Sequence, residues 1–176
     1  MIDGGKGGAK TNIHGLEFER RVDLRKIFDK LNGYEVKEND LYFDDKIVGK
    51  FYKKYGLYSG LLKEHKIDAS KRISKKLLPD ETLLVLKSNT LFVIEMKFQK
   101  TPGSVDEKLQ TCDYKLKQYN KILKGSGIKI KYLYILNDWF KKPEYKDTLN
   151  YIKSVDCDYY FNELKFSVLG LPEIKK

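Results

Sequence analysis

Asp80, Glu95 and Lys97 are the residues of this 176-residue chain whose types and spacing could carry out chemistry on a charged substrate. Asp80 follows a proline, and Glu95 and Lys97 stand two residues apart in TLFVIEMKFQ (90–99), which otherwise has the composition of a buried strand. Two carboxylates suit a hard cation such as Mg²⁺, with Mn²⁺ as a substitute, and the carbonyl of Met96 could add a ligand. Such a metal lowers the pKa of a bound water, which Lys97 could orient or deprotonate.

Alternation along this strand predicts which side chains share a face. One face is wholly apolar and carries Phe92, Ile94, Met96 and Phe98, whereas the other carries Leu91, Val93, Glu95, Lys97 and Gln99. The second face becomes polar toward the end of the strand, so we expect the charges to project at the mouth of a cleft. An ordinary surface salt bridge is the simpler interpretation of the pair alone, since such pairs are common and contribute little.

The short connection KSN (87–89) predicts a hairpin that pairs 82–86 with 90–99. This hairpin would bring Asp80 close to Glu95, so that two carboxylates and one lysine converge at one edge of the sheet. Glu81 could replace Asp80 as a metal ligand, but the aspartate next to the proline is the better candidate.

Hydrophobic periodicity predicts a single α/β domain over residues 14–176, with a mixed sheet flanked by helices. Helices are predicted over about 15–31, 57–66, 104–124 and 145–154, with Ser104 and Glu107 at capping-box spacing. Strands are predicted at 34–36, 41–43, 82–86, 90–99, 128–136 and 158–161. Residues 1–13 are glycine-rich without periodicity, and we expect a flexible basic arm there.

The motifs PD at 79–80 and EMK at 95–97 together resemble the signature of the PD-(D/E)xK nucleases, the restriction-endonuclease-like superfamily. Gly15-Leu16-Glu17-Phe18-Glu19 is similar to the G-x-x-x-E of the family's first helix, which implies a third acid at Glu19. The apolar face of that predicted helix favours Glu17 instead, so both stay candidates. Gln99 matches a family position that often carries a polar residue, which implies contact with a metal-bound water or a phosphate.

The flanking segments SKKLLPDE, IEMKFQ and GSVDEKLQT are most similar to small type II restriction endonucleases, and the likeness covers about residues 13–165. The resemblance implies a restriction-endonuclease-like fold and Mg²⁺-dependent cleavage of double-stranded DNA at a specific sequence. Cleavage of both strands implies a homodimer, with a cognate DNA methyltransferase of the same site as a further partner. A Holliday-junction resolvase is an open alternative because Arg20 follows Glu19, and so is a non-catalytic basic DNA-binding module.

The charge of the chain is +10, from 35 Lys or Arg against 25 Asp or Glu, and a basic surface attracts polyanions such as nucleic acid. Residues 50–76 hold nine Lys or Arg and two acidic residues, and so +7 of this charge. The predicted DNA contacts are Lys50, Lys53, Lys54, Tyr55, Lys71, Arg72, Lys75 and Lys76, with Lys6 and Lys10 in the arm. A solvated lysine-rich face is the alternative, and we favour it for Lys108, Lys115, Lys117 and Lys121 of the 104–124 helix.

Several classes of protein are disfavoured by what the sequence lacks. The first residues have no apolar region typical of a secretory signal, and the apolar runs are too short to span a bilayer, so a soluble cytoplasmic protein is expected. Cys112 and Cys157 match no paired-ligand spacing and are expected to be reduced core residues. Two histidines without HExxH or CxxC disfavour zinc-dependent hydrolysis.

Overall fold

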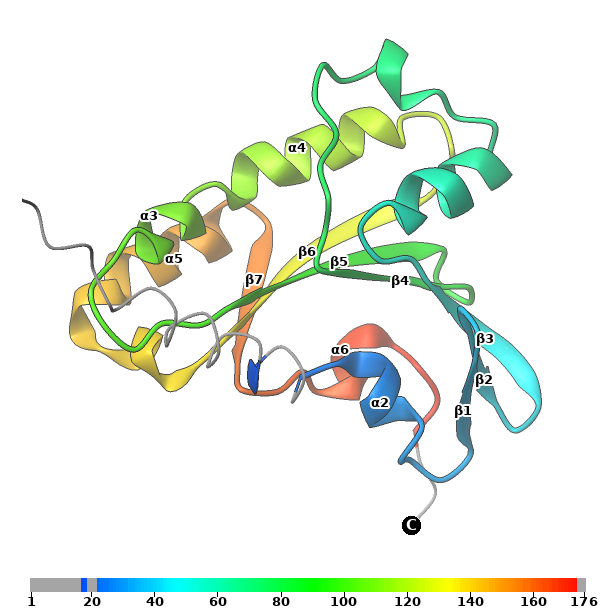
Figure 1. The fold of residues 1–176 in the computed structure, drawn as a ribbon, viewed down its shortest axis with the longest axis horizontal. Helices are drawn as coiled ribbons and strands as arrows, with labels where there is room; N and C mark the ends of the chain where they lie inside the picture. The colour runs from blue at the N-terminus through cyan, green and yellow to red at the C-terminus, as the bar shows by residue number, and fades with distance from the viewer. Residues whose placement is uncertain (1–16, 19–21, 174–176) are drawn as a thin grey trace, which may run out of the picture.

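The computed structural model describes residues 17–18 and 22–173, and all structural statements below concern these residues (Figure 1). They form one seven-stranded sheet whose strands follow one another in chain order. The strands are β1 (Tyr34–Lys37), β2 (Asp40–Phe43), β3 (Lys46–Phe51), β4 (Glu81–Val85), β5 (Thr90–Lys97), β6 (Lys129–Leu136) and β7 (Cys157–Phe161). Strands β1 to β5 pair antiparallel, whereas β5, β6 and β7 pair parallel, so the predicted mixed sheet of an α/β domain is confirmed.

Helices cover both faces of this sheet (Figure 1). The α-helices are α2 (Leu24–Phe28), α3 (Val105–Leu109), α4 (Cys112–Ile122), α5 (Lys146–Ser154) and α6 (Phe166–Leu169). The shorter elements are the π-helix η1 (Leu57–Leu62) and the 3-10 turns η2 (Ala69–Lys71), η3 (Asp138–Lys141) and η4 (Pro143–Tyr145). One core lies between the sheet and η1, α4 and α5, and the other lies between the sheet and α2 and α6.

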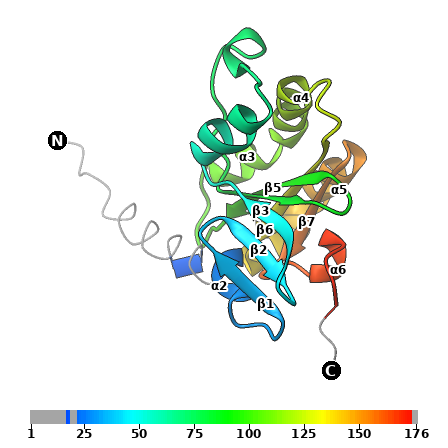
Figure 2. The same cartoon turned by 90° about the vertical axis from the view of Figure 1, so that its right-hand side faces the viewer.

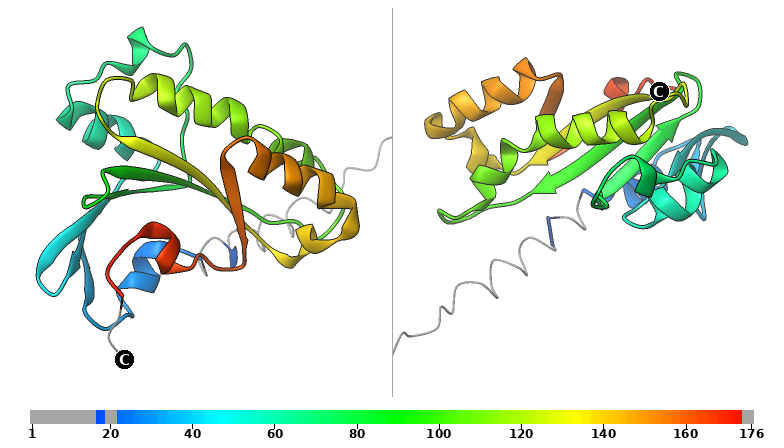
Figure 3. Two further views of the ribbon diagram at one scale, coloured as in Figure 1. Left: turned by 180° about the vertical axis from the view of Figure 1, so that it is seen from behind. Right: turned by 90° about the horizontal axis from the view of Figure 1, so that it is seen from above.

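The alternation predicted for residues 90–99 is confirmed. Phe92, Ile94 and Met96 belong to the core beneath α2 and α6, whereas Leu91 and Val93 belong to the core beneath α4. The predicted hairpin is also present, with Glu81 of β4 opposite Ile94 of β5. From β5 the chain crosses over through α3 and α4 to the parallel strand β6, and α4 runs along this strand (Figure 3, right).

The helix predicted over 104–124 is divided into α3 and α4. The hydroxyl of Thr111 donates to the carbonyl of Lys108 at 2.7 Å, a local bond that competes with the helical pattern. Ser104 is the N-cap of α3, as predicted, but its side chain makes no capping hydrogen bond. The helix predicted over 15–31 is also interrupted, because Asp23 has an extended backbone and accepts from the backbone N–H of Arg25 as the N-cap of α2.

Strand β3 and helix α6 were not predicted. The sequence of β3, KIVGKF, mixes charges with a glycine, which hides its strand character. Gly49 is required by packing, since a Cβ atom there would lie 3.0 Å from both the Leu83 side chain and the Leu84 carbonyl. Figure 2 shows β1, β2 and β3 side by side at one end of the sheet.

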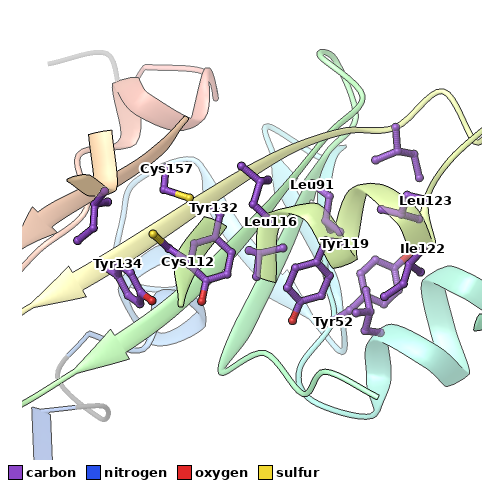
Figure 4. Close-up of a cluster of buried hydrophobic side chains, with 14 of the residues drawn as sticks. Tyr52, Leu91, Cys112, Leu116, Tyr119, Ile122, Leu123, Tyr132, Tyr134 and Cys157 are labelled. Atoms are coloured by element: carbon purple, nitrogen blue, oxygen red, sulfur yellow. The ribbon is translucent and has the colours of Figure 1, made fainter. Parts of the chain in front are cut away.

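Cys112 and Cys157 are free and buried, as expected from the sequence. Cys112 begins α4 and Cys157 begins β7, and the two side chains lie near one another in the core (Figure 4). Within the described part of the chain, no helix has the length and apolar character needed to cross a membrane.

Candidate active site

The hairpin of β4 and β5 brings the three predicted catalytic residues together. Asp80 directly precedes β4, and Glu95 and Lys97 lie near the end of β5. The Asp80 carboxylate is anchored there because its Oδ2 accepts from the backbone N–H of Met96 at 2.9 Å. The side chain of Asp80 is 29% exposed, whereas that of Glu95 is only 7% exposed, so the cluster opens to solvent on the Asp80 side.

Lys97 is the centre of the cluster. Its Nζ lies 2.8 Å from Glu95 Oε2 and 3.5 Å from Asp80 Oδ2. The same ammonium donates to the carbonyl of Met96 at 3.2 Å. Two carboxylate oxygens and one carbonyl oxygen therefore surround a single positive charge.

Lys115 is a functional candidate whose role the sequence did not predict. Its Nζ lies 3.1 Å from Glu95 Oε1, so each oxygen of Glu95 faces an ammonium group. Lys115 stands three residues after Cys112 and four before Tyr119, both of which are buried. Residues three and four apart share one side of a helix, so this spacing was the signal that Lys115 points toward the sheet.

The charges of the cluster stabilise one another. Burial disfavours the ionised form of Glu95, but Lys97 and Lys115 outweigh this effect and lower the pKa of Glu95. Burial likewise disfavours the charged form of Lys97, but Glu95 and Asp80 outweigh it and raise the pKa of Lys97. Lys97 is therefore protonated near neutral pH and can donate hydrogen bonds, which favours its role in orienting a water over its role as a base.

Three tyrosines form an apolar wall behind Glu95. Tyr134 stands opposite Glu95 in the parallel register of β5 and β6, and Tyr132 precedes it on the same face (Figure 4). Burial, and then the charge of Glu95, raise the pKa of Tyr132 and of Tyr119 in α4, so both hydroxyls stay protonated.

The donor atoms of the cluster fit a hard divalent cation. Asp80, Glu95 and the Met96 carbonyl offer only oxygen, and an oxygen of each lies within 3.5 Å of Lys97 Nζ, which would have to leave this point before a metal could bind there. In the described part of the chain, no group of three or more His, Cys, Asp or Glu side chains could hold a metal by itself. A magnesium ion here would thus have two carboxylates and a carbonyl, with waters and substrate phosphate completing its ligands.

Gln99 has contacts of its own at the ends of β5 and β6. Asn137 accepts from its backbone N–H at 3.1 Å and donates to its carbonyl at 2.8 Å, which links the ends of β5 and β6. The Gln99 side chain is buried, and its Nε2 lies 3.4 Å from the carbonyl of Gly103. Its contact with a metal-bound water or a phosphate stays a prediction.

The remaining predicted acids have different positions. Glu81 belongs to the opposite face of β4, where its Oε2 lies 3.4 Å from Arg25 Nε, so it does not share the position of Asp80. Glu17 is exposed. Glu19 lies outside the described residues, as do Lys6 and Lys10.

Three of the predicted DNA contacts lie beside the site. Lys53 and Lys54 line a small hollow together with Asp80 and Met96, and Lys54 is fixed because its backbone N–H donates to the Pro79 carbonyl. Tyr55 follows them and is 62% exposed.

The other predicted DNA contacts that the structure describes do not line this hollow. Lys71, Lys75 and Lys76 are exposed, and Lys76 lies over the ring of Tyr58. Lys50 is partly buried, 3.8 Å from Glu64. Arg72 has a structural role, because its Nη1 donates to the carbonyls of Ile122 and Lys124 at the end of α4.

Comparison of the chain with models of protein families, with curated proteins and with solved structures found no match in any of the three. The function proposed next therefore depends on the residues and the geometry of the site.

Proposed function

We propose that the protein is a Mg²⁺-dependent endonuclease of type II restriction character, which hydrolyses phosphodiester bonds of double-stranded DNA at a specific sequence as a homodimer. The observation that carries the proposal is the position of Lys97 Nζ within 3.5 Å of both Asp80 and Glu95. These residues carry the resemblance to the PD-(D/E)xK nucleases, and a mixed sheet flanked by helices agrees with the fold that the resemblance implies.

The position of the cluster in the sheet also supports the proposal. Glu95 and Lys97 lie toward the carboxyl end of β5, where the chain leaves the parallel pair β5 and β6 for the crossover through α4. Ligands of α/β sheets usually bind outside the carboxyl ends of such strands. A DNA phosphate could approach there from the exposed side of Asp80, where Lys53 and Lys54 lie.

Each residue of the cluster has a distinct role in the proposed reaction. Asp80, Glu95 and the Met96 carbonyl would hold the metal, which supplies a water of lowered pKa and neutralises phosphate charge. The Lys97 ammonium would donate to the attacking water or to the phosphate oxygens as negative charge develops on them. Lys115 keeps Glu95 ionised, and Lys53, Lys54 and Tyr55 would position the DNA backbone.

Incubation with plasmid DNA in Mg²⁺ or Mn²⁺, followed by mapping of the ends, tests this proposal. Discrete fragments with a shared end sequence are the expected result, and a four-way junction serves as the second substrate. Symmetric nicking of the junction with intact plasmid would identify a resolvase instead. DNA binding without cleavage in either metal would identify a non-catalytic module.

The Lys97→Ala variant separates catalysis from binding. It should bind DNA and fail to cut it, whereas Lys100→Ala, an exposed lysine just after β5, should cut normally. Equal loss of cleavage in both variants would mean that the ammonium of Lys97 has no special part in the reaction.

A further inference from the structure

A second and larger cavity lies next to the candidate active site. It has a volume of about 560 Å³, within the range of small-molecule sites, and lies between the turn joining β1 to β2, the end of β3, and η1. The small hollow that contains Asp80 and Met96 shares three lining residues with it, namely Asp23, Lys53 and Glu81. The cavity thus adjoins the point where the phosphodiester would bind.

The charge of this cavity is opposite to that of the protein. Five carboxylates line it, from Asp23, Glu38, Asp40, Glu64 and Glu81, and three cations, from Arg25, Lys50 and Lys53. Their sum is 3 − 5 = −2, in a chain of charge +10. A phosphate group would be repelled by this excess of carboxylates, whereas a ligand that presents N–H donors would be favoured.

Arg25 is held rigidly within the wall of the cavity. Its Nη1 donates to the carbonyl of Glu38 at 3.2 Å and to Asn39 Oδ1 at 3.1 Å, and its guanidinium lies over the ring of Phe51. Its Nε is buried and has no hydrogen-bond partner of normal geometry among the described residues, although Glu81 Oε2 lies 3.4 Å away. The Nε of Arg25 is thus held by the charge of Glu81 without a hydrogen bond of normal geometry, an arrangement that is uncommon for a buried donor.

The opposite wall is also fixed before any ligand binds. The hydroxyl of Tyr52 donates to Glu64 Oε2 at 3.0 Å, and Lys50 Nζ lies 3.8 Å from the same oxygen. Glu81 is 2% exposed, and its burial is only partly compensated by Arg25 and Lys53. The cavity therefore presents oriented acceptors together with a few donors, which is the pattern that hydrogen-bond recognition requires.

We infer that this cavity binds a nucleobase of the DNA substrate that carries an exocyclic amino group, and so contributes to sequence recognition. The inference rests on the proposed nuclease function. Asp and Glu accept from base amino groups, whereas Arg and Lys donate to base acceptors, and the cavity contains both kinds of group. Adenine, cytosine and guanine carry such an amino group and thymine does not, so thymine is the base that should bind least.

The position of the cavity explains how a base could reach it. A nucleotide next to the scissile bond could keep its phosphate near Lys53 and Lys54 and place its base past Asp23 and Glu81. The base would have to leave the stacked helix, as happens in enzymes that bind an extruded nucleotide.

Titration of the isotope-labelled protein with deoxyadenosine, deoxycytidine, deoxyguanosine and thymidine, followed by NMR, tests the inference without cleavage. The amide signals of Ser59 and Gly60, which line the cavity, should shift with the three amino-bearing nucleosides and much less with thymidine. Equal shifts with all four nucleosides, or no shift, would overturn the inference. Spermidine is a separate arm, because a shift with spermidine alone would identify a site for amines and not for bases.

Gly56 offers a steric test that leaves the carboxylates unchanged. It lines the cavity, its backbone is helical, and no atom lies within 4 Å of a Cβ built there, so a side chain can be added at this position without strain at its Cβ, and Gly56→Phe places a ring at the cavity wall. We expect Gly56→Phe to weaken nucleoside binding at least about tenfold at an unchanged melting temperature. Gly56→Ala is the matched control and should bind normally, and equal binding by both variants would overturn the inference.

A charge test uses Asp40 and an aspartate of the same hairpin. Asp40→Asn removes one acceptor charge from the cavity, whereas Asp45→Asn makes the same change outside it. The first variant should alter the bases found next to the mapped cut, and the second should not. If the wild-type protein binds nucleosides but cuts no DNA, the proposed nuclease function is wrong and the binding of bases in the cavity is not. If the wild-type protein cuts DNA and Gly56→Phe cuts the same sites at the same rate, the inference about the cavity is wrong and the nuclease function is not.

Discussion

Replacement of Lys115 by alanine tests how far Glu95 depends on its second ammonium partner. Lys115 is 25% exposed and Glu95 is 7% exposed, at an Nζ to Oε1 distance of 3.1 Å. Removal of one partner from a fully buried ion pair costs about 3–5 kcal/mol. Here Glu95 keeps Lys97 and Lys115 is partly hydrated, so we expect Lys115→Ala to lower the free energy of unfolding by about 1–2 kcal/mol at pH 7.

The pH dependence of this loss follows from the lowered pKa of Glu95. A carboxyl whose pKa is lowered by folding contributes stability above its unfolded pKa and loses that contribution as the pH falls through its folded pKa. Without Lys115, the folded pKa of Glu95 should rise toward its ordinary value, because one of the two ammonium groups that favour its ionised form is gone. The difference in stability between variant and wild type should therefore be largest near neutral pH, and it should shrink as the pH falls toward the lowered pKa of Glu95 in the wild type.

Urea unfolding followed by circular dichroism between pH 3 and pH 7 would measure both effects. Lys117→Ala is the matched control, because Lys117 lies on the same helix, is 71% exposed and pairs with Asp113. Its stability should equal that of the wild type within the error of the measurement at every pH. Equal effects of the two variants at pH 7, or a Lys115→Ala difference that stays constant down to pH 3, would refute the reasoning.

Two further predictions concern the ends of the elements that hold the site. Asn137→Ala removes two hydrogen bonds to the Gln99 backbone and should lower the free energy of unfolding by about 1–3 kcal/mol, measured in urea against Asn150→Ala, an exposed asparagine of α5. Arg72→Ala leaves the last carbonyls of α4 without their donor and should lower the melting temperature, whereas Lys75→Ala, an exposed lysine, should not. A stable Arg72→Ala variant with weakened DNA binding would assign Arg72 to the DNA and not to α4.

The positions of Asp80, Glu95 and Lys97 could be predicted because each follows from local rules. Alternation decides which face of β5 a residue occupies, and a short hairpin decides which residues of β4 lie beside it. The same rules identify the opposite apolar face of β5, which packs beneath α2 and α6. These features depend only on neighbours in sequence or across one turn.

The features that could not be predicted depend on contacts between distant segments. Strand β3 pairs with β4, in which Val85 lies more than 30 residues after its partner Gly49, and the glycine and two lysines of β3 mask the strand preference of its Ile47, Val48 and Phe51. Lys115 reaches Glu95 only because the crossover places α4 over β6, and a lysine next to an apolar stripe is more often solvated.

Whether the ion cluster serves catalysis or structure can be decided with Lys97→Met. If the cluster serves structure alone, removal of one member should lower the free energy of unfolding by about 3–5 kcal/mol, because the other members are left buried and unpaired. In Lys97→Met, Glu95 keeps its ion pair with Lys115, and Asp80, which is 29% exposed, keeps its hydrogen bond from the Met96 N–H. The structure therefore predicts that the free energy of unfolding falls by less than about 2 kcal/mol. Loss of cleavage in a variant of nearly unchanged stability would support a catalytic ammonium, and unfolding of the variant would mean that Lys97 holds the sheet together.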